Sequence, residues 1–171
     1  LDVFFKGRPA RTLHDLILGK AAIDEIIVPV ADRVDLLPGG SGVYDLQSVS
    51  AFEKQILLDQ VSSLGGEYDY LLIDTAPGIA DHVLYLNSAA QEIVVVVTPD
   101  PSSIADSYAL IKVLNQRYRE TRFSIVVNQA KDEQDGLKIF QRLDDVARKF
   151  LYIGLDFKGC VPTDPVLRQA T

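Results

Sequence analysis

The chain has 171 residues, a length typical of one domain that can bury roughly 70% of its unfolded surface. Its composition, 47% hydrophobic and 24% charged, is that of a packed globular protein and excludes a disordered chain. The net charge of −7 disfavours a broad nucleic-acid-binding face. A single cysteine, Cys160, excludes an internal disulfide and predicts a reducing, cytoplasmic location.

The first third of the chain carries three element signals. Thr12 is placed to cap a short helix that ends at Gly19, and the apolar run 34–37 predicts an early strand. The sequence Ser50-Ala51-Phe52-Glu53 has the pattern of a capping box. Apolar residues then recur at helical spacing as far as Leu64, which predicts a helix beginning near residue 51.

Four later stretches have the composition of strands and alternate with helical patterns. The predicted strands are Tyr70–Asp74, Ile93–Thr98, Phe123–Asn128 and Leu155–Val161. Between them, a second capping-like pattern at Ser103–Asp106 predicts a helix running to about Tyr118. A further helix is predicted from about Gln134, with an apolar stripe made of Leu137, Phe140, Leu143, Ala147 and Phe150. This order predicts a doubly wound α/β fold with a mainly parallel sheet, in a single domain over residues 1–171.

Ligands of open α/β sheets bind beyond the carboxyl ends of the strands, so the residues leaving each predicted strand are the candidate site. Asp74 can hold Mg²⁺ through water, and the Pro77-Gly78 turn can bring a backbone amide to a γ-phosphate. The carboxamide of Asn128 suits the edge of adenine. Taken singly, Asp74 could instead be a strand-ending residue that caps the next turn, and an Asn such as Asn128 at a strand end is usually a turn residue.

Several of these segments together resemble one family, from one end of the chain to the other. Tyr70–Ile79 resembles the Walker B and switch II segment of MinD/ParA-type deviant Walker ATPases, a P-loop NTPase class. Thr98–Lys112 is similar to the strand, loop and helix that follow in the FlhG/FleN flagellar-number regulators of that family. Val126–Gln129 resembles the family's adenine-reading strand end, and Val161–Asp164 resembles the loop beside the base. The opening residues 1–3 look like the end of switch I.

The resemblance implies an ATP-dependent switch that regulates flagellar number, flagellar placement or the site of cell division. It implies that Asp74 holds the Mg²⁺ shell, that Gly78, after Pro77, senses the γ-phosphate, and that Asn128 with Pro162 and Asp164 holds adenine. It also implies a homodimer across the nucleotide and a regulatory protein partner. Contact with the inner face of the cell membrane would be peripheral and would use segments outside this chain.

The chain departs from the family at the phosphate-binding loop. No Lys-Gly-Gly-x-Gly-Lys pattern occurs, and Gly39-Gly40-Ser41-Gly42 is followed by Val43-Tyr44, which predicts a turn and not a phosphate loop. We therefore expect residues 1–171 alone to bind ATP poorly and to be inactive as an ATPase. Two other functions stay open: a ParA-type partition ATPase, which the acidic charge disfavours, and an interaction module that keeps the fold without nucleotide.

The same departure affects the sheet. The family strand that carries the phosphate loop is central and lies beside the strand equivalent to Tyr70–Asp74. Without it, the backbone around Leu71 and Ile73 lacks hydrogen-bond partners, each costing about 1–3 kcal/mol if buried. We expect either that the sheet closes by shifting its strands or pairing with another chain, or that the central strand lies outside this numbering.

Overall fold

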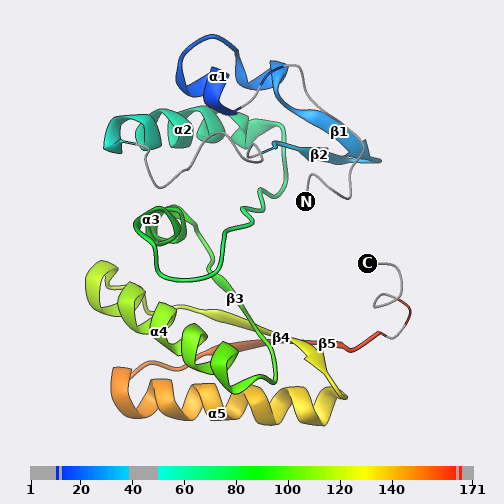
Figure 1. The fold of residues 1–171 in the computed structure, drawn as a ribbon, viewed down its shortest axis with the longest axis vertical. Coiled ribbons are helices and arrows are strands. Elements are labelled where there is room, and N and C mark those ends of the chain that lie inside the picture. The colour runs from blue at the N-terminus through cyan, green and yellow to red at the C-terminus, as the bar shows by residue number, and fades with distance from the viewer. Residues whose placement is uncertain (1–10, 12, 39–49, 165, 167–171) are drawn as a thin grey trace. The chain divides into compact units, whose positions relative to one another are not determined.

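The computed structural model describes residues 11, 13–38, 50–164 and 166 (Figure 1). The chain divides into two compact units, Leu1–Ile73 and Asp74–Thr171, which are taken in turn. The single domain expected over residues 1–171 stays a prediction. None of the described helices is both long enough and apolar enough to cross a bilayer.

The first unit packs short helices beside a small hairpin. Its elements are α1 (Leu13–Ile17), the 3-10 helix η1 (Ile23–Glu25), β1 (Val28–Ala31), β2 (Val34–Leu36), α2 (Ala51–Ser63) and the 3-10 helix η3 (Leu64–Gly66). Strands β1 and β2 are antiparallel. A buried cluster of Leu16, Ile17, Ile23, Ile26 and Leu64 holds the unit together.

Two predictions for this unit are confirmed, one lies partly outside the described residues, and one lies wholly outside them. The helix beginning near residue 51 is α2, and the run 34–37 contributes β2. Gly19 has φ +67°, a conformation that favours glycine, and it follows the last turn of α1 as expected. The capping residue Thr12 and the turn at 39–42 lie outside the described residues.

The second unit contains the parallel sheet. Its elements are α3 (Asp81–Ala89), β3 (Val94–Val97), α4 (Pro101–Tyr118), β4 (Ser124–Ala130), α5 (Glu133–Leu151) and β5 (Asp156–Pro162). The strand order is β3-β4-β5, and both neighbouring pairs are parallel. Figure 1 shows α4 and α5 side by side along one face of this sheet. The α/β class and the parallel sheet predicted from the sequence are therefore confirmed.

The core of the second unit lies between the sheet and these two helices. Val97, Ile125 and Val127 are fully buried on the strands, and they meet buried residues of the helices such as Ile111 and Leu143. On β3 the burial alternates, because Val95 and Val97 are buried while Val94 and Val96 are exposed. Only one face of β3 is covered within the described part of the unit, and β4 is its one described strand partner.

The predicted strand Tyr70–Asp74 is wrong, since no strand is assigned between residues 68 and 80. Its apolar side chains are exposed, Tyr70 at 87% and Leu72 at 91%. A central strand needs a hydrogen-bonding neighbour on each side, and the described strands supply none beside this segment. Among the described residues the parallel sheet consists of β3, β4 and β5 and does not include this segment. Pairing with another chain, and a central strand outside this numbering, stay predictions.

The helices α4 and α5 correct two details of the prediction. Helix α4 begins at Pro101 with Asp100 as its N-cap, and not at Ser103, because the carboxylate of Asp100 accepts the Ser102 N–H at 2.9 Å. Helix α5 buries Gly136, Ile139, Leu143 and Ala147. The predicted stripe is therefore partly wrong, since Leu137 and Phe150 are exposed.

Candidate nucleotide site

The carboxyl ends of β4 and β5 bring together the residues predicted to hold adenine. Parallel pairing places Asn128 opposite Val161 and Ala130 opposite Pro162. Beyond the last pair, the backbone N–H of Thr163 donates to the Ala130 carbonyl at 2.9 Å, and its hydroxyl donates to the Gln129 carbonyl at 3.1 Å. The two strand ends are therefore joined edge to edge, with the loop 162–164 beside Asn128.

The side chain of Asn128 is half-buried and partly engaged. Its Oδ1 accepts the backbone N–H of Gln129 at 2.9 Å, and Gln129 has φ +58°. The Nδ2 donors of Asn128 have no hydrogen-bond partner within the described part of the chain. This arrangement fixes the carboxamide and leaves it able to donate to a ligand.

The loop that follows β5 is ordered by local hydrogen bonds. Asp164 is exposed and accepts the backbone N–H of Val166 at 2.8 Å, while Pro162 is exposed at the end of β5. Thr163, which the sequence argument did not single out, provides both bonds to the Gln129–Ala130 backbone. Its hydroxyl next to a proline at a strand end is the signal that could have identified it.

The connection from β3 to α4 completes the same edge of the sheet. The carboxylate of Asp100 accepts both the N–H and the hydroxyl of Ser102 at 2.9 Å. Both hydrogen bonds lower the pKa of Asp100, and the one from the Ser102 backbone N–H is the larger cause. The carboxylate therefore stays ionised at the helix N-terminus. The hydroxyl of Ser103 accepts the N–H of Thr98 at 3.0 Å. Both serines thus fix the loop.

Asp74, Pro77 and Gly78 lie in the irregular segment that opens the second unit. Asp74 is exposed, and it forms no hydrogen bond or ion pair with a described residue. Gly78 has φ +106°, and a side chain added there would meet nothing within 4 Å. The expectation that Asp74 ends a buried strand is wrong, because that strand is not formed. The metal and phosphate roles of these residues stay predictions.

The residues present fit the adenine base of Mg-ATP better than they fit its metal ion and phosphates. The free Nδ2 donors of Asn128, beside the loop 162–164, fit the base. Among the described residues no group of three or more His, Cys, Asp or Glu side chains could hold a metal by itself. Asp74 alone fits a water-mediated role toward a Mg²⁺ that phosphates already hold.

A depression of about 380 Å³ lies at the opposite, amino ends of the strands. Nine residues line it: Gln91, Glu92, Thr121, Arg122, Phe123, Ser124, Gly154, Leu155 and Asp156. The Ser124 hydroxyl donates to Glu92 at 2.6 Å, and Lys158 pairs with Glu92 at 3.4 Å and with Asp156 at 2.8 Å. These contacts join the segment before β3 to β4 and β5, so we assign this cluster to the stability of the sheet.

Comparisons with curated proteins find relatives in the family that the sequence resembles. No protein-family model matches the chain. The antiactivator FleN of Pseudomonas aeruginosa is 35% identical over 170 residues, which are 99% of this chain and 61% of FleN. The flagellum site-determining protein YlxH of Helicobacter pylori is 30% identical over 99% of this chain and 57% of YlxH.

A third relative is an uncharacterized ATP-binding protein of Methanocaldococcus jannaschii, 28% identical over 96% of this chain and 58% of its own length. Septum site-determining MinD proteins match as well. The chain spans about three fifths of the length of the curated relatives it matches. It is a relative of the MinD/ParA-type proteins of the FlhG/FleN group.

Proposed function

We propose that this protein is an ATP-binding, MinD-like ATPase that acts as a dimerising switch in setting flagellar number or placement, or the site of division. One observation carries the proposal: β4 and β5 hold Asn128 beside the loop 162–164 at the carboxyl edge of a parallel sheet. The similarity to FleN and YlxH over 99% of the chain gives the regulatory context. Because the chain spans about three fifths of these relatives, the proposal concerns the whole protein.

The residues divide into those that bind the base and those that serve the phosphates. Asn128 donates to adenine through Nδ2, since its Oδ1 is held by the Gln129 N–H. Asp74 supplies a carboxylate to the hydration shell of Mg²⁺, which neutralises phosphate charge when bound. Gly78 offers a backbone amide in a turn open enough for close approach. The proposal includes a homodimer across the nucleotide, a regulatory protein partner and a cytoplasmic location.

The test uses a chimera in which this chain follows the phosphate-loop segment of a family member. We expect the chimera to bind Mg-ATP and hydrolyse it, and the chain alone to show neither above background, because amides and a lysine are needed around the β- and γ-phosphates. Titration calorimetry and phosphate release measure the two properties. Micromolar binding with turnover by residues 1–171 alone would contradict this account.

Two substitutions in the chimera separate the proposed roles. Asn128→Ala should raise KM for ATP about tenfold while sparing kcat, because the loss of a ligand hydrogen bond costs about 1–2 kcal/mol. Asp74→Ala should abolish turnover and keep the adenine contacts, so it still binds a fluorescent ATP analogue. If the folded chimera binds no nucleotide, the interaction-module function is favoured. If it binds DNA in an ATP-dependent way, the partition function is favoured.

A further inference from the structure

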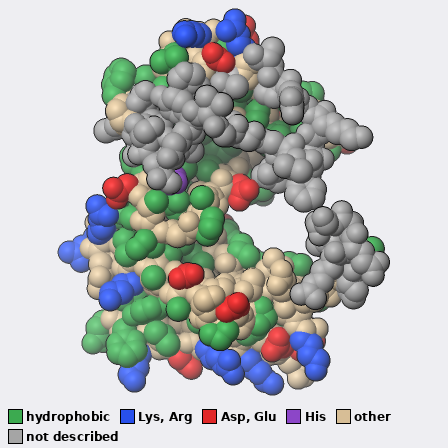
Figure 2. All heavy atoms as spheres, viewed as in Figure 1, with side chains coloured by type: hydrophobic (Ala, Val, Ile, Leu, Met, Phe, Trp, Pro, Cys, Tyr) green, Lys and Arg blue, Asp and Glu red, His purple; other side chains and the backbone are tan. Residues whose placement is uncertain are grey.

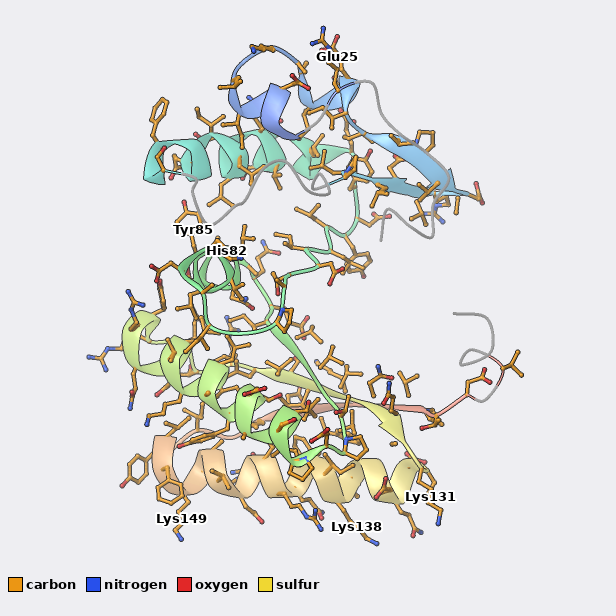
Figure 3. All side chains as sticks on the ribbon, in the orientation of Figure 1. Glu25, His82, Tyr85, Lys131, Lys138 and Lys149 are labelled. Carbon is orange, nitrogen blue, oxygen red and sulfur yellow. The ribbon has the colours of Figure 1, made fainter. Side chains whose placement is uncertain are left out.

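Strand β4 contains a bulge at Gln129, one residue after Asn128. The β5 partners of Asn128 and Ala130 are consecutive residues, so Gln129 between them has no partner in the register of the two strands. Gln129 also has φ +58°, a left-handed conformation that residues with a side chain adopt rarely and at a cost. Figure 3 labels Lys131, which follows β4 directly and marks this end of the strand. Strained bulges are over-represented beside functional sites, where they redirect a side chain.

The bulge has a packing effect of its own. Side chains alternate along a regular strand, so without the bulge Gln129 would lie on the same side as the buried Ile125 and Val127. With the bulge, Gln129 is exposed and Ala130 is fully buried in its place. Packing alone could therefore account for the bulge, and a role in the nucleotide site needs separate evidence.

Hydrogen bonds connect the bulge to the candidate nucleotide site. The N–H of Gln129 donates to Oδ1 of Asn128 at 2.9 Å, and the Thr163 hydroxyl donates to the Gln129 carbonyl at 3.1 Å. The N–H of Thr163 also donates to the Ala130 carbonyl at 2.9 Å. Because the strand is paired before and after the bulge, φ of Gln129 can change only if the peptide plane between Asn128 and Gln129 rotates. That rotation would turn the N–H away from Oδ1 and release the carboxamide.

The chain just after β4 carries charged side chains of both signs. Lys131 is followed by Asp132 and Glu133, and all three are exposed. Figure 2 shows basic and acidic side chains together at this end of the second unit. The Nδ2 donors of Asn128 are neutral, and they have no hydrogen-bond partner among the described residues. Recognition of an uncharged base beside them depends on a few polar groups whose orientation is fixed.

We propose that Gln129 is a positioning residue for nucleotide binding. Its left-handed backbone, held by Thr163, orients the Asn128 carboxamide so that the Nδ2 donors stay available to a base. The inference rests on the proposed function, in which Asn128 binds adenine, and it adds two residues that act through Asn128 without touching the ligand. The site needs the conformation of Gln129 and not its side chain. A residue that tolerates the left-handed region should therefore replace it without loss, and a β-branched residue should not.

The first experiment measures the order of the Asn128 side chain in the 171-residue chain, without nucleotide. The readout is the heteronuclear NOE of the side-chain NH₂ groups in isotope-labelled protein. Asn87 and Asn115, the only other asparagines, are internal references, because the Nδ2 of each donates to a carbonyl at 2.8 Å. We expect the NOE of Asn128 in the parent chain to lie close to those of the two references.

Two test variants disturb the bulge. Gln129→Val introduces a β-branched residue that disfavours the left-handed region, and Thr163→Val removes the hydroxyl while keeping the shape of the side chain. Both should lower the NOE of Asn128 and leave the two reference asparagines unchanged. Circular dichroism verifies folding, and Thr163→Val, at an exposed position, decides the outcome if Gln129→Val does not fold.

Three matched variants should leave the NOE of Asn128 as it is in the parent chain. Gln129→Asn tolerates the left-handed conformation, and Thr163→Ser keeps the hydroxyl. Thr121→Val makes the same change as Thr163→Val on the amino side of β4, where Thr121 is exposed and its hydroxyl has no hydrogen-bond partner among the described residues.

The second experiment measures ATP hydrolysis by the chimera that carries the phosphate-loop segment. Gln129→Val should raise KM for ATP about tenfold, Thr163→Val about threefold, and both should change kcat less than about twofold. Because Gln129 acts through Asn128, adding Gln129→Val to Asn128→Ala should raise KM no further than Asn128→Ala alone. A bulge needed only for packing would lower stability and leave KM of the folded variants unchanged.

Two results would overturn the inference: an NOE of Asn128 that both test variants leave unchanged, or effects of Gln129→Val and Asn128→Ala on KM that add. The two experiments also separate the inference from the proposed function. If the parent chimera binds no ATP, the proposed function fails, and the NOE measured without nucleotide still decides whether Gln129 orients Asn128.

Discussion

At the scale of single residues, Gly136 shows how closely α5 and β5 pack. A Cβ added at Gly136 would lie 2.7 Å from the Cβ of Cys160, a backbone-fixed atom that cannot move aside. At Gly154, in contrast, an added Cβ would meet the end of the flexible Arg148 side chain at 2.8 Å. The first glycine is therefore required by packing, whereas the second has room to change.

We predict that Gly136→Ala destabilises the protein by about 1–2 kcal/mol, although alanine is the better helix former. Gly154→Ala is the matched control and should change the free energy of unfolding by less than about 1 kcal/mol, in either direction. Urea unfolding followed by circular dichroism measures both. Equal effects of the two substitutions would show that the contact with Cys160 does not limit the packing of α5.

At the scale of elements, the amino ends of the three strands are tied together by one carboxylate. Glu92 accepts the Ser124 hydroxyl at 2.6 Å and pairs with Lys158 at 3.4 Å. The hydrogen bond from the Ser124 hydroxyl is the largest cause that lowers the pKa of Glu92 below its ordinary value near 4.5, and the Lys158 ammonium is the next largest. The ionised carboxylate thus joins the segment before β3 to both β4 and β5.

The lowered pKa gives a signed dependence of stability on pH. Because the folded state holds the ionised form, its contribution is fully present above about pH 4.5 and is lost as pH falls through the folded pKa. We predict that Glu92→Gln lowers the urea midpoint at pH 7 and that the difference from the parent chain shrinks below pH 4.5. Ser124→Ala should show the same trend, since it removes the main cause of the shift. A difference independent of pH between 7 and 3.5 would contradict this prediction.

The elements that could be predicted from sequence are those whose neighbours lie within the chain. The strands β3, β4 and β5 could be predicted because they are rich in β-branched residues and pair with one another. Helix α4 packs on β3, and helix α5 packs on β4 and β5. Strand β1 was missed, since Pro29 argues against a strand and the turn before β2 uses Arg33 at φ +58° in place of glycine. Helix α3 was missed because its N-cap, Ala80, makes no side-chain hydrogen bond.

The candidate site likewise has one part that could be predicted from the sequence and one part that could not. Asn128 and the loop 162–164 were placed correctly beside one another, because pairing of β4 with β5 is enough to join them. Asp74 was expected at the tip of a strand, but the apolar pattern of residues 70–73 describes a strand that forms only between partners. A strand pattern shows that a segment can form a strand when neighbouring strands are available to pair with it. Among the described residues, no strand pairs with the segment 70–73.

At the scale of the whole molecule, the segment 70–73 and strand β3 both expose apolar side chains, and β3 has one strand partner, β4, among the described residues. Leu71 and Ile73 are 52% and 44% exposed, and Val94 and Val96 are 52% and 56% exposed. Unpaired edges and exposed apolar rows of this kind promote association of chains. The resemblance to the MinD/ParA family predicts that the phosphate-loop strand lies beside the segment 70–73, and we expect the same strand to pair with β3 as well.

We predict that joining this chain to the phosphate-loop segment of a family member protects the backbone amides of residues 71–73 and 94–97 from hydrogen exchange. In the chain alone, amides 71–73 should exchange at nearly the rate of an unfolded peptide, because no described strand pairs with them. The buried strand β4, at Ile125 and Val127, serves as an internal control and should be protected in both proteins. The chimera should also unfold at higher urea, since pairing a central strand satisfies several backbone groups worth about 0.5–1.5 kcal/mol each. If residues 71–73 are strongly protected in the 171-residue monomer, the segment already pairs without that strand. In that case Asp74 would lie at the end of a strand that this chain forms without the phosphate-loop strand, which contradicts the prediction.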